Sequence, residues 1–231
     1  MAIILNIDTS TDVCSVAVGG DGMIISHFED YEGRNHASLL SGFIKACLDR
    51  ISEIDLKLDA VAVSMGPGSY TGLRIGLSEV KGLCFALNIP LIGVNTLKLL
   101  TTSVMFSGKD FSDKTLFCPM IDARRMEVFT AIYDAALDEV LSPQPMIISA
   151  ESFSNFLDSN EIWFFGNGSD KVREIITSPN ASFIPDIKPL ATDMLALSEM
   201  AWMKKEFLDL AYSTPWYFKD FQSTVPKNKV F

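Results

Sequence analysis

Apolar and polar positions alternate in regular blocks along the first hundred residues. Short apolar runs predict strands at residues 2–7, 14–18, 23–28, 59–64 and 90–94. The turn at 19–22, Gly-Gly-Asp-Gly, is typical of a β-hairpin. Apolar residues recur at helical spacing over residues 35–51, 71–87 and 96–105. The predicted order is β-β-β-α-β-α-β-α, which favours a mixed α/β sheet with helices on its faces.

The pattern is weaker in the second half of the chain. Apolar runs predict strands at residues 116–121, 126–133 and 161–165, and helical spacing returns at residues 189–205. This half echoes the first, which predicts two related subdomains, residues 1–103 and residues 104–231. We expect the last helix to be able to pack back on the first subdomain. The polar tail after Ser223 predicts a loose end.

Composition narrows the class of protein. The 231 residues are 48% hydrophobic and include 16 Phe, which is enough for a full core. The net charge is −10, and Lys and Arg supply most of the affinity for nucleic acid, so the chain alone should bind nucleic acid weakly. Four separated cysteines predict buried thiols in a reducing compartment. We read no signal peptide and no membrane-spanning run, which predicts a cytoplasmic protein.

Asp8, Thr9 and Ser10 end the first predicted strand and enter a turn. Amides and hydroxyls in such a turn can face a phosphate, and a carboxylate there can hold a metal-bound water. An ordinary polar β-turn accounts for the same residues. The two interpretations stay open, and these three residues are our candidate for a vestigial phosphate loop.

Residues 66–76, Gly-Pro-Gly-Ser-Tyr-Thr-Gly-Leu-Arg-Ile-Gly, are the most informative stretch. Gly66 and Gly68 permit a tight loop after a strand, and Ser69 or Thr71 can cap the following helix. The stretch lacks the lysine of a phosphate-binding P-loop. A phosphate at this helix N-terminus is physically allowed, although nothing in the stretch requires it.

The helix that follows contains interior glycines. Each costs about 1 kcal/mol relative to Ala, and such glycines usually mark the close approach of another backbone. Packing on the sheet is one explanation, and a second apolar face that meets a partner helix is another. The second explanation predicts a partner face on the first two long helices, formed by Leu39, Phe43, Ile75, Gly76, Glu79, Gly82 and Leu83.

Residues for catalysis or metal binding do not form a recognisable set. His27 lies in a predicted strand and His36 opens a helix, so they do not make a His-x-x-x-His pair. Ser69 lacks the frame of a nucleophile elbow. We therefore expect no catalytic residue and no metal site. Residues 122–127, Asp-Ala-Arg-Arg-Met-Glu, predict a solvated hairpin from which Arg124 can also contact an acidic group of a partner.

These stretches together resemble the TsaB (YeaZ-like) family. The resemblance covers most of the chain, is weak in the second half, and rests on residues 7–10, 66–76, 81–83, 93–97 and 121–128. It implies an α/β protein with the actin-like, Hsp70-like ATPase fold, in which two related subdomains of mixed β-sheet are flanked by helices.

The resemblance also implies a function. Such a subunit looks like a degenerate paralogue of the catalytic threonylcarbamoyl transferase, whose His-x-x-x-His metal pair is absent here. It would pair through its first two helices with that TsaD-type subunit, and a small TsaE-type ATPase would join them. The complex modifies the adenosine next to the tRNA anticodon. We therefore expect a non-catalytic scaffold subunit that has no cofactor of its own and meets tRNA only through the complex.

Some alternatives stay open at this point. The resemblance does not decide whether the isolated chain is a homodimer, or whether nucleotide binds at the partner interface. A small ATPase or sugar kinase of the same fold would use Asp8 and the loop at residues 66–68, and Asp8→Ala would abolish its turnover. An M22-type metallopeptidase would carry bound zinc, and the missing ligands argue against it.

Overall fold

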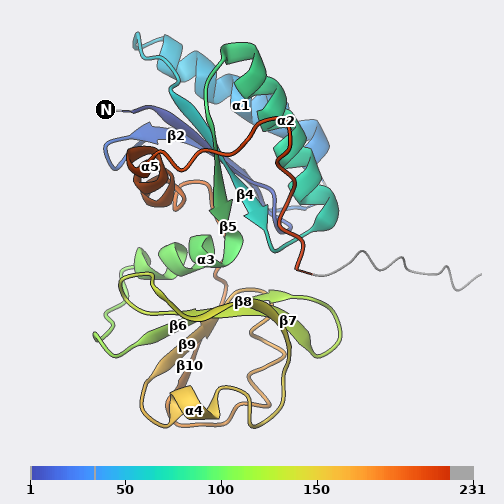
Figure 1. Cartoon of the computed structure of the whole chain (residues 1–231), viewed down its shortest axis with the longest axis vertical. Coiled ribbons are helices and arrows are strands. Elements are labelled where there is room, and N and C mark those ends of the chain that lie inside the picture. The colour runs from blue at the N-terminus through green and yellow to red at the C-terminus, as the bar shows by residue number, and fades with distance from the viewer. Residues whose placement is uncertain (1, 34, 219–231) are drawn as a thin grey trace, which may run out of the picture.

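A computed structural model describes residues 2–33 and 35–218, which form two five-stranded sheets (Figure 1). The first sheet has the order β3-β2-β1-β4-β5. Its strands are β1 (Ile4–Asp8), β2 (Cys14–Gly20), β3 (Met23–Asp30), β4 (Ala60–Gly66) and β5 (Leu91–Asn95). The second sheet has the order β10-β9-β6-β7-β8. Its strands are β6 (Leu116–Asp122), β7 (Glu127–Tyr133), β8 (Glu139–Ile147), β9 (Ile162–Phe165) and β10 (Ala181–Ile184).

The two sheets repeat one arrangement. In each half the first strand is central, the next two strands pair antiparallel on one side, and the last two lie parallel on the other. The predicted echo between the halves is therefore confirmed. The predicted boundary between residues 103 and 104 falls inside α3 (Thr96–Met105), which contacts both sheets, and the division itself stays a prediction.

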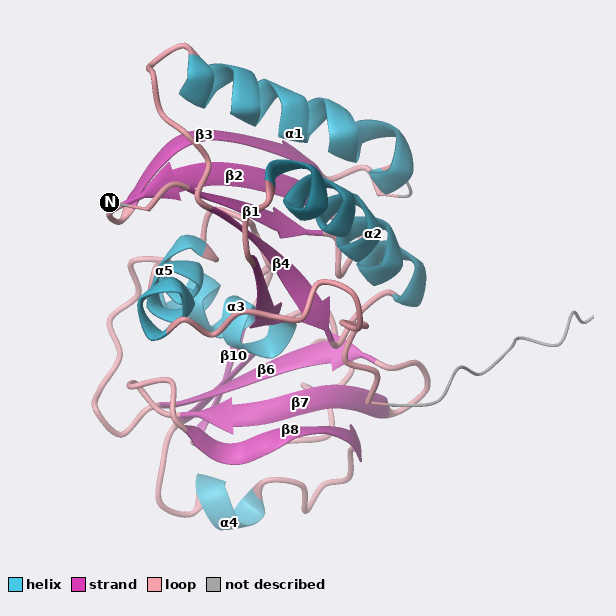
Figure 2. Ribbon diagram, turned by 45° about the horizontal axis from the view of Figure 1, so that its top comes forward, coloured by secondary structure: helices cyan, strands magenta, loops and turns pink. Residues whose placement is uncertain are grey.

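Two long helices cover one face of the first sheet (Figure 2). α1 (His36–Ser52) packs on β2 and β3, and α2 (Tyr70–Leu87) packs mainly on β4. Each buries an apolar stripe at helical spacing, and these stripes join the core of the first sheet. The buried stripe of α1 contains Leu40, Ile44, Cys47 and Ile51, and that of α2 contains Leu73, Leu77, Val80 and Cys84.

The second half departs most from the sequence prediction. Its last helix, α5 (Leu195–Lys204), begins six residues later than predicted. The segment before it is held in another conformation, because the Ala191 amide donates to Ser15 Oγ of β2 at 2.9 Å. The pattern missed β8, β10 and the one-turn helix α4 (Ser154–Leu157). β8 is an edge strand that contains Pro143 and Pro145, which hide a strand signal.

α5 and α3 lie on the face of the first sheet opposite α1 and α2, and α5 contacts β1, β2 and β5 (Figure 1). All four cysteines are buried and unpaired, as the sequence predicted. No helix within the described residues is both long and apolar enough to span a bilayer. The predicted loose tail after Ser223 lies outside the described residues.

Candidate functional site

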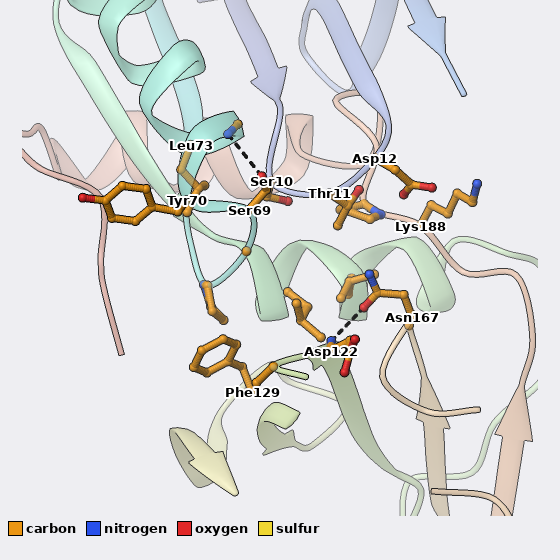
Figure 3. A pocket seen from close by; sticks show the side chains of 18 of the residues that line it. Ser10, Thr11, Asp12, Ser69, Tyr70, Leu73, Asp122, Phe129, Asn167 and Lys188 are labelled. Atoms are coloured by element: carbon orange, nitrogen blue, oxygen red, sulfur yellow. Dashed lines mark hydrogen bonds between the residues drawn. The ribbon is translucent and has the colours of Figure 1, made fainter. Parts of the chain in front are cut away.

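A cleft of about 1100 Å³ separates the two sheets (Figure 3). Its upper wall is the turn after β1, from Ser10 to Asp12, together with the loop and first turn of α2, Pro67 to Leu73. Its lower wall includes Ile121 to Arg124, Phe129 and Asn167 from the second half. The Asp122 amide donates to Asn167 Oδ1 at 2.9 Å and holds this wall together.

Asp8 does not reach the cleft. Its side chain is fully buried and accepts from Ser10 Oγ at 2.9 Å and from the Ser10 amide at 3.2 Å. Burial raises the pKa of Asp8 to about 6, although hydrogen bonds from Ser10 lower it in part. The carboxyl group points into the protein, which favours the ordinary polar turn, and a vestigial phosphate loop at Asp8 stays a prediction.

Thr9 is also turned inward. Its hydroxyl donates to the Gly72 carbonyl at 2.8 Å. A Cβ at Gly72 would overlap the Thr9 carbonyl oxygen, and a Cβ at Gly76 would overlap the Thr9 hydroxyl. The glycines thus mark a close backbone approach, but the neighbour is the turn of the same chain. Of the three predicted phosphate-loop residues only Ser10 lines the cleft, and its carbonyl already accepts from the Ser69 amide at 2.6 Å.

Acidic side chains outnumber basic ones around the cleft. The acidic residues are Asp12, Glu32, Asp122, Asp170 and Asp186, and the basic residues are Arg124, Lys188 and His36. Figure 3 shows Asp12 and Lys188 on the same side of the opening. Within the described residues no three His, Cys, Asp or Glu side chains gather as metal ligands do. The charge balance therefore disfavours a bare phosphate in this cleft.

The turn at residues 122–127 is tightly held. Arg124 and Arg125 both adopt positive φ angles, 69° and 52°, which are costly for side chains of this size. Lys171 donates to the Asp122 carboxylate and to the carbonyls of Arg125 and Glu127. The predicted solvated hairpin is thus present between β6 and β7, Lys171 holds its turn, and Arg124 lines the cleft.

A second candidate site is the outer face of α1 and α2. We define the outer face as the exposed residues Ala37, Ser41, Gly42, Ser78, Glu79 and Gly82. A shallow groove between the helices joins Ala37 to Ser78 and Glu79. No described atom lies within 4 Å of the Cβ position at Gly42 or Gly82. These small residues leave room for another backbone.

The predicted partner face needs correction at several positions. Gly76 is buried against Thr9, so it cannot touch a partner. Ile75 and Leu83 are half-buried and pack on the core of the first sheet, so a charged side chain at Leu83 would disturb the fold. Phe85 is 81% exposed on α2 and was missed, because apolar patterning assigns a phenylalanine to the interior.

Leu39 and Phe43 lie on the far flank of α1. They are half-buried, and Phe43 stacks on Phe28 of β3 with ring centres 5.6 Å apart. Ala37, two residues before Leu39, points about 200° away from it and lines the groove beside α2. The two predicted residues of α1 therefore lie on the flank away from the groove, and the other predicted residues belong to α2. Glu79 and Gly82 are its members on the outer face, and a partner role for any of them stays a prediction.

Comparisons with known proteins give the family. Residues 29–215 match the family model TsaD, described as tRNA N6-adenosine threonylcarbamoyltransferase. The chain is 31% identical over 149 residues to the tRNA threonylcarbamoyladenosine biosynthesis protein TsaB of Bacillus subtilis, covering 63% of this chain and 62% of that protein. It is 36% identical over 130 residues to TsaB of Escherichia coli, covering 56% and 54%. Both matches thus span less than two thirds of these relatives.

Structural comparison agrees. YeaZ from Pseudomonas aeruginosa superposes with a TM-score of 0.78 at 29% identity, over 94% of this chain and 100% of that chain. The ethanolamine utilization protein EutJ from Carboxydothermus hydrogenoformans has a TM-score of 0.50 at 8% identity, over 85% of this chain and 90% of that chain, which speaks for the fold alone. Two subdomains with repeated sheets and these neighbours confirm the predicted actin-like ATPase fold.

Proposed function

Since the chain belongs to the TsaB (YeaZ-like) branch of the tRNA N6-adenosine threonylcarbamoyltransferase family, we propose that it is a scaffold subunit in tRNA threonylcarbamoyladenosine biosynthesis. In this role it binds a catalytic TsaD-type subunit and performs no chemical step itself. A TsaE-type ATPase completes the complex. The net charge of −10 supports contact with tRNA only through these partners.

The outer face of α1 and α2 is the observation that carries the proposal. Two long helices lie side by side and present small residues, among them Gly42 and Gly82, with no described atom near their Cβ positions. Beside them Phe85 exposes 81% of its surface, an unusual place for a large aromatic side chain in a protein that works alone. A second helix pair can approach such a surface closely and cover the ring.

The inward orientation of Asp8 and Thr9 supports a subunit without its own catalysis. The start of α2 lies directly against the turn that would otherwise receive a phosphate, through Gly72 and Gly76. The rival ATPase or kinase would need that turn open. ATP turnover on the order of 1 per second by the purified chain, lost in Asp8→Ala, would establish the rival instead.

Binding to the TsaD-type subunit after Gly82→Arg tests the scaffold proposal. Arginine has a better helix propensity than glycine and the site is exposed, so the free chain should keep its fold. In the complex the guanidinium would be buried without a partner charge, so co-purification should fall at least about tenfold.

The matched control is Met203→Arg on α5, at a residue that is 73% exposed and lies on the opposite face of the first sheet. It should bind like the wild type. Wild-type affinity in Gly82→Arg, with the fold intact, would show that the partner does not use the outer face.

A further inference from the structure

The chain after α5 runs from β5 along α2 to the end of β4. We call residues 208–218 the strap, and Figure 1 shows it in red, passing beside α2 and ending between the two sheets. The Leu208 amide donates to the Leu91 carbonyl of β5 at 2.8 Å. The Trp216 amide donates to the Met65 carbonyl of β4 at 2.7 Å. These two backbone bonds fix the strap at its start and near its end.

Two cations of α2 also hold the strap, Lys81 between those points and Arg74 just beyond the second. Lys81 Nζ donates to the carbonyls of Ala211 at 3.0 Å and Ser213 at 3.1 Å. Arg74 Nε donates to the Tyr217 hydroxyl at 2.9 Å, and its guanidinium lies 4.0 Å from the centre of the Tyr70 ring. Arg74 and Lys81 are two helical turns apart and therefore share one flank of α2. That flank reaches the strap and also borders the outer face, since Arg74 lines the groove beside Ser78 and Glu79.

Glycines on the first sheet leave space for the strap. A Cβ at Gly66 would lie 2.9 Å from the Trp216 carbonyl oxygen. A Cβ at Gly93 would lie 2.8 Å from Leu208 Cδ1. A larger residue at Gly66 would press on the backbone of the strap, and one at Gly93 would displace the side chain of Leu208 or Met65. The surface beneath the strap therefore fits it closely.

The end of the strap reaches the second subdomain. Trp216, Tyr217 and Phe218 all line the cleft, and the Phe218 ring lies 6.3 Å from the ring of Phe129 on β7. The strap therefore spans the mouth of the cleft, attached to β4 and β5 on one side and resting on β7 on the other.

The strap is anchored at its start and largely exposed beyond it. Leu208 and Leu210 pack against the core of the first sheet. Tyr212 is 85% exposed, Tyr217 42% and Trp216 38%. The part after Leu210 is held mainly by its polar contacts to α2 and β4, and a surface segment held in this way opens at a far lower free energy than the core.

We propose that the strap is a releasable latch across the cleft. In the docked state it holds the two subdomains together, and its release from Arg74 and Lys81 lets the cleft open while both sheets stay folded. This inference concerns the chain by itself and does not depend on the partner proposed above.

Hydrogen exchange of the full-length chain in the variant Lys81→Met tests the latch. The change removes two charge-assisted hydrogen bonds and keeps the aliphatic stem, so exchange in residues 208–218 should quicken about tenfold. Peptides of the cleft walls, residues 67–73 and 121–129, should also exchange faster. Peptides of β1 and α5 should not change.

Two variants make the outcome decisive. Lys45→Met on α1, whose ammonium pairs with exposed Asp49, should leave strap and cleft exchange as in the wild type. Tyr217→Leu removes the bond to Arg74 and should repeat the effect of Lys81→Met, which guards against a folding defect of one variant. Faster strap exchange without faster cleft exchange in both variants would overturn the latch, as would strap amides that exchange only with global unfolding.

Discussion

The two halves of the molecule build the same sheet with very different connections. In the first half the strands are linked by α1, of 17 residues, and α2, of 18 residues. In the second half the equivalent links are α4, of four residues, and a series of turns between β9 and β10. Since short links suffice to complete this sheet, the long helices are not required for it. Their extra surface is available for a partner.

The ends of the two central strands differ in the same way. Asp8 ends β1 and is fully buried beneath the start of α2. Asp122 ends β6, is 45% exposed and pairs with Lys171. The first half has closed the position over with a helix, whereas the second half has left it open to the cleft. Three comparisons of variants, from the largest effect to the smallest, test these differences.

Gly72→Ala should have the largest effect on stability. The added Cβ would overlap the Thr9 carbonyl oxygen, which is backbone and cannot rotate away. We expect the free energy of unfolding in denaturant to fall by about 3 kcal/mol or more.

Gly82→Ala on the same helix is the matched control. No described atom lies near its Cβ position, so the better helix propensity should raise the free energy of unfolding by about 1 kcal/mol. Equal effects at the two glycines would show that α2 does not press on the turn after β1.

Asp8→Asn should act next most strongly, in a pH-dependent way. The folded-state pKa of Asp8, about 6, lies above its ordinary value of 3.8, so the folded protein holds this proton more tightly than the unfolded chain. The contribution of Asp8 to the free energy of unfolding is therefore fully present below about pH 4 and is lost as the pH rises through about 6. Asn does not ionise, so the gain of the variant over wild type should grow from pH 4 to pH 8 by about 3 kcal/mol.

Asp122→Asn gives the contrast for the second half. Its pair with Lys171 is partly exposed, so the loss in unfolding free energy should be about 1 kcal/mol or less at neutral pH. Urea titrations of both variants across pH 4–8 measure this difference. A flat difference for Asp8→Asn would mean that the carboxyl group is solvated.

Phe85→Ser should have the smallest effect on the isolated chain. The ring is 81% exposed, so the free energy of unfolding should change by no more than about 0.5 kcal/mol. Co-purification with a TsaD-type subunit should weaken nonetheless, because we propose that the partner covers the Phe85 ring in the complex. Met203→Ser, at a residue 73% exposed on α5, is the control and should bind normally.

Periodicity alone determined most of the first half of this fold. The stripes of α1 and α2 are complete, and the runs that become β1 to β5 are short and bounded by turn residues, so local pattern and burial agree. The glycine-rich stretch at residues 66–76 also predicted that another backbone approaches α2 closely. The sequence did not say which backbone approaches, because that neighbour, Thr9, is more than sixty residues distant.

Tertiary structure decided the features that depend on direction and distance. It turned Asp8 and Thr9 inward, moved Gly76 from a partner face to the interior, and exposed Phe85. It also brought the strap to Arg74 and Lys81, more than a hundred residues away along the chain. A one-dimensional pattern records which residues prefer burial, whereas which flank a side chain occupies and what lies against it follow only from the packing of whole helices and sheets.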